Sequence, residues 1–231
     1  MIQYTLLSSQ NIKEIVSPFG FKKITRIKKL TGGSENTNYF FVTESHSYVL
    51  NLFERKSLNQ VNDLAQLLLY LQRHNFKTSQ PVFTLDQRLV LNWRNKPVMV
   101  KSFFEGKIMD DLPPHLLRLA GKKLGQLHQL APVDYLPKIL PFGYENFHLV
   151  NEYARSSPFS KWLFGIKDYV QPYLDLNLPK ALIHSDLFSN NIVVSYDETS
   201  VTILDFEEAS NYYRIFDLGM AIIGLCSVNK T

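Results

Sequence analysis

One histidine, two aspartates and one asparagine stand at spacings that suit phosphoryl transfer. His184 precedes Asp186 by two positions, Asn191 follows five positions later, and Asp205 comes 14 residues after that asparagine. A hydroxyl that attacks a phosphate needs a carboxylate within hydrogen-bond reach, and Mg²⁺ prefers oxygen ligands while keeping water and phosphate oxygens in its shell. We therefore predict that Asp186 is the catalytic base, that Asn191 and Asp205 bind Mg²⁺, and that His184 supports the loop. The alternative is an ordinary polar turn between two strands.

Further along the chain, acidic residues cluster directly after Asp205. Glu207 and Glu208 are candidates for binding a cationic substrate, although a solvated turn explains the same residues. Asp217 lies just inside a predicted last helix, where it could cap or hydrogen-bond the catalytic loop. The remaining histidines lack metal-ligand spacing, so we predict surface or packing roles for all five of them: His46, His74, His115, His128 and His148.

Two segments of the first hundred residues suit a nucleotide. Gly32, Gly33, Ser34 and Asn36 lie in a polar stretch between two predicted strands, and backbone N–H groups in such a loop can bind phosphates. The same residue types also make an ordinary hairpin turn. The apolar segment 98–106 ends in a glycine turn, and we predict that its 100–104 part, with Lys101 and Phe103, contacts the adenine of ATP; a plain strand and turn is the alternative.

Composition is that of an ordinary globular protein. The 231 residues are 45% hydrophobic and 20% charged, with a net charge of +4, and they contain no block of like charges that would favour nucleic acid. A single cysteine excludes an internal disulfide and fits a cytoplasmic location. We see no signal-peptide pattern and no apolar run of the ~20 residues that cross a bilayer.

Periodicity divides the chain into a β-rich first part and a mainly helical second part. The first part is predicted to be a small antiparallel sheet with one helix at 58–74, and 10–18 is a candidate short helix before it. The strands are expected at 22–30, 39–43, 47–53, 82–85, 88–92 and 97–104. The second part is predicted to hold helices at 115–129, 158–174 and from 214 onward, with short strands at 181–183, 191–195 and 201–204. We expect an N-lobe over 1–102 and a C-lobe over 103–231, with a linker near 103–107.

These residues resemble a known family. The set His184, Asp186, Asn191 and Asp205 resembles the catalytic signature of the aminoglycoside phosphotransferase and choline kinase superfamily. Segments 32–40, 48–54, 102–107 and 184–188 resemble the type II homoserine kinase branch, whereas 205–219 is more similar to choline and ethanolamine kinases. The resemblance implies an α+β, bilobal, protein-kinase-like fold, use of ATP and Mg²⁺, and phosphorylation of a small amino alcohol, with homoserine favoured and choline or ethanolamine next. It implies no nucleic-acid or membrane partner.

The sequence departs from this family in two places. Many members carry a basic residue on the third strand to hold the phosphates, whereas Asn51 stands there in this chain. Arg55, Lys56, Lys28 and Lys29 are the alternative sources of that charge. Family members also continue for several helices beyond the last one here, so we expect a shortened C-lobe. Both departures motivate a rival hypothesis, a catalytically weak, pseudokinase-like module that binds nucleotide.

Overall fold

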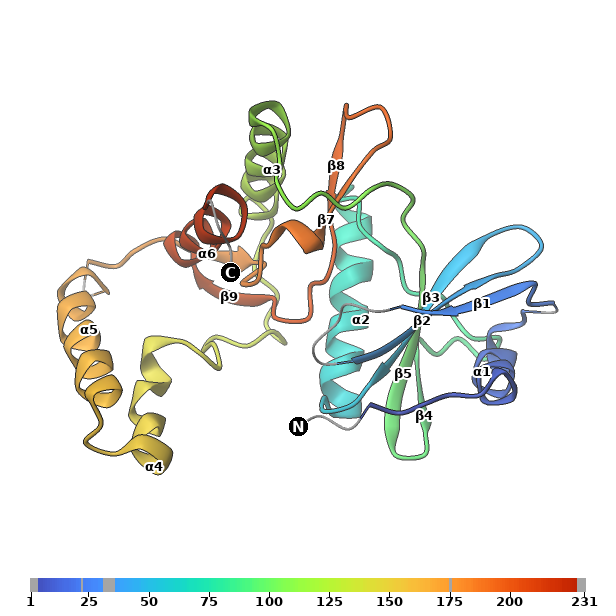
Figure 1. The fold of residues 1–231 in the computed structure, drawn as a ribbon, viewed down its shortest axis with the longest axis horizontal. Coiled ribbons are helices and arrows are strands. Elements are labelled where there is room, and N and C mark those ends of the chain that lie inside the picture. The colour runs from blue at the N-terminus through green and yellow to red at the C-terminus, as the bar shows by residue number, and fades with distance from the viewer. Residues whose placement is uncertain (1–3, 22, 31–35, 175, 228–231) are drawn as a thin grey trace. The chain divides into compact units, whose positions relative to one another are not determined.

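The computed structural model describes residues 4–21, 23–30, 36–174 and 176–227 (Figure 1). The chain splits into two compact units, residues 1–106 and 107–231. No helix within the described ranges is long and apolar enough to cross a membrane. Cys226, the single cysteine, is exposed.

The first unit is built on a five-stranded antiparallel sheet with the strand order β1-β2-β3-β5-β4. Its strands are β1 (Arg26–Lys29), β2 (Asn36–Val42), β3 (Ser47–Phe53), β4 (Val90–Trp93) and β5 (Lys96–Ser102). The prediction of a small antiparallel sheet is therefore confirmed. The first strand is shorter than predicted, and β2 begins earlier, so Asn36 belongs to a strand and pairs with Phe53 rather than lying in the turn.

The predicted strand over 82–85 is wrong. Only one ladder contact forms there, from the backbone N–H of Val82 to the carbonyl of Val100 at 2.8 Å. The chain then folds back on itself, because the backbone N–H of Thr84 donates to the carbonyl of Arg88 at 2.8 Å and the Thr84 hydroxyl accepts from the backbone N–H of Arg88 at 2.8 Å. Gln87, with φ of 65°, closes this turn. Side-chain turn chemistry thus outcompetes strand pairing.

Two helices cover the sheet of the first unit. Helix α1 (Ser9–Val16) packs its apolar residues on one sheet face, where they form a core with Tyr39, Phe41, Leu50, Leu52, Val98 and Val100. Helix α2 (Leu58–Arg73) contacts β4 and β5. It begins at a capping box in which Ser57 and Gln60 exchange side-chain-to-backbone hydrogen bonds of 3.3 and 2.8 Å. The helix predicted at 58–74 is therefore confirmed.

A buried carboxylate fixes the start of β2. The side chain of Glu54 is only 2% exposed and forms an ion pair with Lys96. It also accepts hydrogen bonds from the Thr37 hydroxyl at 2.6 Å and the Thr5 backbone at 2.7 Å. Burial opposes ionisation, but these donors hold the pKa of Glu54 below its usual range. The strand that follows segment 31–35 is therefore anchored at its second residue.

The second unit is mainly helical and carries two small antiparallel strand pairs. Its elements are α3 (Pro114–Leu127), α4 (Val150–Ala154), α5 (Pro158–Leu174), β6 (Lys180–Ile183), β7 (Ile192–Val194), β8 (Val201–Ile203), β9 (Ser210–Tyr213) and α6 (Arg214–Ala221), followed by a π-helical turn over Ile222–Cys226. Strand β6 pairs with β9, and β7 pairs with β8. The predicted helices and the first three strands are confirmed, whereas α4 and β9 were not predicted.

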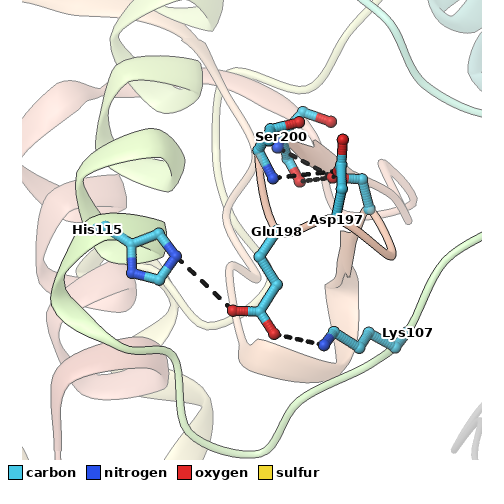
Figure 2. A network of polar contacts seen from close by, with 7 residues as sticks. Lys107, His115, Asp197, Glu198 and Ser200 are labelled. Carbon is cyan, nitrogen blue, oxygen red and sulfur yellow. Dashed lines mark hydrogen bonds and ion pairs between the residues drawn. The ribbon is translucent and has the colours of Figure 1, made fainter.

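The β7–β8 hairpin is tied to the first residue of this unit. Glu198, at the hairpin tip, accepts a hydrogen bond from Lys107 Nζ at 2.5 Å, and its other carboxylate oxygen lies 3.8 Å from His115 Nε2. Figure 2 draws both contacts. The hydrogen bond from Lys107 holds the pKa of Glu198 below its usual range. Lys107 also exchanges backbone hydrogen bonds of 2.9 Å with Val194. These contacts fix the hairpin whose opposite end carries Asn191.

Candidate active site

The segment predicted to be catalytic is a loop between β6 and β7. Strand β6 is buried from Ala181 to Ile183, and the next two residues, His184 and Ser185, are fully buried. Ser185 has φ of 72°, a left-handed conformation that is unusual for a residue with a side chain. Asp186 follows and is partly exposed. The loop therefore leaves the core through a strained turn that presents its aspartate at the surface.

Asp217 of α6 holds this turn in place. Its buried carboxylate accepts the backbone N–H of Ser185 at 2.8 Å on one oxygen. The other oxygen accepts the backbone N–H of His184 at 2.9 Å and lies 2.8 Å from Nε2 of His128. Asp217 was predicted to hydrogen-bond the catalytic loop, and these are its contacts in the structure.

His128 is a residue whose site contact the sequence did not reveal. It was predicted, with the other histidines, to have a surface or packing role. His128 lies at the end of α3, is only 8% exposed and hydrogen-bonds the carboxylate of Asp217 in α6. The signal available in the sequence was its place at the end of an amphipathic helix, after Leu124 and Leu127. A histidine there lies next to the buried face, where its ring needs a polar partner.

The ring of His184 links the two acidic segments. Its Nε2 lies 2.8 Å from the carbonyl oxygen of Leu204, and its Nδ1 accepts the backbone N–H of Asp186 at 3.3 Å. The carbonyl of Leu204 can only accept a hydrogen bond, so the ring carries a proton on Nε2. The ring also packs edge-on against Phe206, with centroids 4.8 Å apart. His184 therefore fixes the backbone on both sides of Asp205 relative to Asp186.

Asn191 joins the same arrangement from the short 3₁₀ turn directly before β7. Its Nδ2 donates to the backbone carbonyl of Asp186 at 2.8 Å and to the carboxylate of Asp186 at 3.1 Å. Its backbone carbonyl accepts the N–H of Leu204 at 2.8 Å, which places the following Asp205 beside it. Asp205 is exposed and has φ of 62°. The structure therefore brings Asp186, Asn191 and Asp205 together from two segments.

Negative charge accumulates around Asp186. Burial raises the pKa of its carboxyl group, and repulsion from Asp205 and Glu208 raises it further, against the opposing effects of His184 and Asn191. Glu207 and Glu208 are partly buried in the turn that follows Asp205. Acidic side chains gathered in this way attract cations.

The donor set fits Mg²⁺ better than a metal held by protein alone. Across the described ranges, no group of three or more His, Cys, Asp and Glu side chains gathers as a metal site. One aspartate and one asparagine are enough for Mg²⁺, which usually keeps several waters and binds substrate phosphates. Nδ2 of Asn191 is engaged with Asp186, and its oxygen makes no hydrogen bond to the described residues. Asp205 and this amide oxygen are therefore available to such an ion.

A glycine in the last π-helical turn packs directly on the catalytic loop. A Cβ atom on Gly224 would lie 2.3 Å from the carbonyl oxygen of Leu187 and 3.0 Å from Cα of Phe188. Only a residue without a side chain allows this approach of two backbones. Gly224 is thus a second positioning residue that sequence reasoning missed, because the contact joins segments more than 35 positions apart.

The residues predicted to bind nucleotide lie in the first unit. Gly32, Gly33 and Ser34 fall outside the described residues. Asn36 opens β2, Phe103 is 37% exposed with its ring 4.8 Å from that of Phe40, and Lys101 is 9% exposed within β5. Of the alternative cations, Lys28, Lys29 and Arg55 are exposed and Lys56 is partly buried.

The whole arrangement matches one protein family. A family model described as the phosphotransferase enzyme family covers residues 26–229. The chain belongs to the phosphotransferase enzyme family. This membership confirms the predicted resemblance and the prediction of a small-molecule phosphotransferase, while the identity of the acceptor is a separate question.

Individual relatives and solved structures support the family assignment. The chain is 24% identical over 231 residues to a homoserine kinase of Methylobacillus glycogenes, covering 98% of this chain and 72% of the relative. Among solved structures, it matches choline kinase LicA from Streptococcus pneumoniae with a TM-score of 0.72 and 16% identity, over 96% of this chain and 76% of that one. It matches spectinomycin phosphotransferase APH(9)-Ia, in complex with ADP and spectinomycin, with a TM-score of 0.67 and 20% identity, over 93% and 73%. The predicted α+β, kinase-like fold is confirmed.

Replacing Asp217 by asparagine should destabilise the second unit. The amide keeps one acceptor but introduces an NH₂ group opposite N–H donors, so at least one buried donor loses its partner. We expect the free energy of unfolding to fall by about 2–4 kcal/mol, measured by urea denaturation. Asp168→Asn, at an exposed position of α5, is the matched control and should change stability by less than about 0.5 kcal/mol. Equal effects of the two variants would contradict the role of Asp217.

A methyl group on Gly224 should disturb the catalytic loop. We expect Gly224→Ala to lower the free energy of unfolding by about 1–3 kcal/mol, because either the helix or the loop backbone must move. Gly219→Ala is the control, since a Cβ atom at that position would have no neighbour within 4 Å, and helix propensity predicts a gain of up to about 1 kcal/mol. Thermal unfolding of both variants tests the difference, and a neutral Gly224→Ala would show that the close approach is not required.

Proposed function

We propose that this protein transfers the γ-phosphoryl group of ATP to the hydroxyl of a small amino alcohol, and that homoserine is the acceptor. The observation that carries the proposal is the joint placement of Asp186, Asn191 and Asp205. The Asp186 carboxylate is held by the Asn191 amide, and Asp205 follows a residue whose N–H binds the Asn191 backbone. A base beside two oxygen ligands is what phosphoryl transfer to an alcohol requires.

In this mechanism Asp186 orients the acceptor hydroxyl and takes its proton. The hydroxyl oxygen forms a bond to the γ-phosphorus, the bond from that phosphorus to the bridging oxygen breaks, and ADP leaves. Asn191 donates to Asp186 through Nδ2, which fixes the carboxylate so that one oxygen can face the hydroxyl. The side-chain oxygens of Asn191 and Asp205 would hold Mg²⁺, which neutralises charge on the phosphates when bound.

The nucleotide would be held by the first unit. Segment 32–38 would cover the phosphates, with Gly32, Gly33, Ser34 and Asn36 contributing, and the 100–104 segment would contact the adenine. Support comes from the family and from the neighbour solved with ADP. The phosphate-binding loop itself falls largely outside the described residues, so its part in the proposal rests on the sequence.

A relative favours homoserine over the other amino alcohols, and the charge of the site favours any acceptor with a cationic nitrogen. The alignment with the homoserine kinase relative covers 98% of this chain. The site also gathers acidic side chains, and repulsion from Glu208 raises the pKa of Asp186. An ammonium group bound beside Glu207 or Glu208 would offset that repulsion. Choline and ethanolamine share the cationic nitrogen, and choline kinase LicA shares the fold, so they are the second candidates.

A panel of acceptors tests the substrate. ATP consumption with Mg²⁺ should be measured by a coupled assay with homoserine, choline, ethanolamine and methylthioribose at equal concentrations. We expect the largest kcat/KM with homoserine, by about tenfold or more over choline, because a missing or mismatched polar group is penalised strongly. A larger value for choline or ethanolamine would replace homoserine as the acceptor. ATP binding without turnover of any of them would favour the catalytically weak, nucleotide-binding module.

Asp186→Asn tests the chemistry apart from the substrate. The amide retains the size of the carboxylate and a hydrogen-bond acceptor for Asn191, but it cannot take a proton at neutral pH. We expect kcat to fall by about 10²–10⁴-fold, while the melting temperature and the dissociation constant of ATP change little. Turnover within a factor of ten of the unaltered protein would remove Asp186 from the role of base.

A further inference from the structure

The sheet of the first unit has one face that is not sealed by α1. Antiparallel register places opposed residues on the same face, so Asn38, Asn51 and Met99 form one row across β2, β3 and β5. Phe40, Val49 and Lys101 form the next row on this face. Phe40, Val49 and Asn38 are only partly buried, so the face around them retains access to solvent or to a ligand.

Lys101 is an unusual member of this face. Its exposure is 9%, and its ammonium group makes no hydrogen bond or ion pair with the residues that the structure describes. The apolar stem of this side chain is therefore buried in the sheet face, while its ammonium group stays available to an anion. By contrast, Lys96, the first residue of the same strand, has its ion pair with Glu54.

The row beside Lys101 holds a second unsatisfied group. Asn51 is 5% exposed, and its Nδ2 donates to Oδ1 of Asn38 at 2.7 Å. Its own Oδ1 is buried and has no hydrogen-bond partner among the described residues. Side chains in adjacent rows of neighbouring strands lie about 7–8 Å apart at the backbone, within reach of a long side chain. A buried acceptor without a donor thus lies in the row next to that of Lys101, whose ammonium group has no acceptor among the described residues.

We infer that the side chain of Lys101 supplies the positive charge that binds the phosphate groups of the nucleotide, with Asn51 orienting its ammonium group, while the backbone of 100–104 contacts the adenine. The ammonium has three donors, so one can reach Asn51 Oδ1 while two remain for phosphate oxygens. The positive charge expected at Asn51 in β3 is then supplied from Lys101 in the adjacent strand β5, on the same sheet face. This inference rests on the proposed function and names the residue that its phosphate contact requires.

Lys28 offers a matched comparison. It belongs to the same row, because it pairs with Phe40, and it shares the sheet face, but it is exposed on the edge strand β1. An exposed lysine is well hydrated and gains little from one more anion. If burial and position determine the contact, Lys101 binds phosphate and Lys28 does not.

Binding of ATP and of adenosine, each measured calorimetrically with Mg²⁺ on the full chain, tests the inference. We expect Lys101→Met to raise the dissociation constant of ATP about tenfold or more and that of adenosine less than about twofold, since adenosine has no phosphate. Lys101→Arg should retain most of the ATP affinity, and Lys28→Met should change neither constant. The melting temperature of Lys101→Met without nucleotide should stay close to that of the unaltered protein, because methionine keeps most of the buried apolar stem.

Other results would overturn the inference. If Lys101→Met lost affinity for ATP and for adenosine equally, the side chain of Lys101 would contact the base. If the variant bound ATP as tightly as the unaltered protein, Lys101 would make no contact with the nucleotide. A selective loss in Lys28→Met alone would move the charge to the edge strand. A lowered melting temperature with equal loss of both ligands would make Lys101 structural. If the unaltered chain binds no ATP, the proposed function fails; if it binds ATP and Lys101→Met binds it equally well, only this inference fails.

Discussion

The carboxylate of Asp217 is fully buried, and burying a carboxylate costs several kcal/mol unless donors surround it. Here the donors are the backbone N–H groups of His184 and Ser185 and the ring of His128. The requirement works in both directions. Asp217 needs these three groups, and the catalytic loop needs Asp217 because Ser185 adopts a left-handed conformation that its own segment does not favour. Helix α6, the end of α3 and the loop after β6 are thereby fixed to one another.

Each further position in the site follows from this anchor through a short series of contacts. The fixed backbone of His184 sets its ring, the ring binds the carbonyl of Leu204, and Asp205 follows directly in the chain. Asn191 binds Asp186 by its side chain and Leu204 by its backbone. Two acidic residues and one amide are thus held close although their charges repel, which is the kind of stored strain that a bound cation and phosphate can relieve.

The sequence could predict the part of this site that is local. His184, Asp186 and Asn191 lie within eight positions, and their residue types limit the chemistry. Two contacts between distant segments were not predicted, because no periodicity in the sequence indicates them. His128 was assigned to the surface or to packing, although it binds a carboxylate 89 positions away. Gly224 was not singled out, because its role is to admit the backbone of Leu187. The strand expected at 82–85 failed for a local reason, since the hydroxyl of Thr84 closes a turn.

In the first unit, too, the position of a charged side chain depends on the residues that surround it. Asn51 interrupts the usual pattern of its family when it is read along one strand. Across the sheet, however, antiparallel register makes positions on neighbouring strands nearly equivalent in where their side chains point. A cation can therefore move from β3 to β5 without any change in the fold, provided that the sheet face holds the stem of its side chain in place. Lys101 meets that condition at 9% exposure, whereas Lys28, at the end of the same row, does not. A missing residue in a linear motif is thus weak evidence for a lost function until the neighbouring strands of the sheet have been compared.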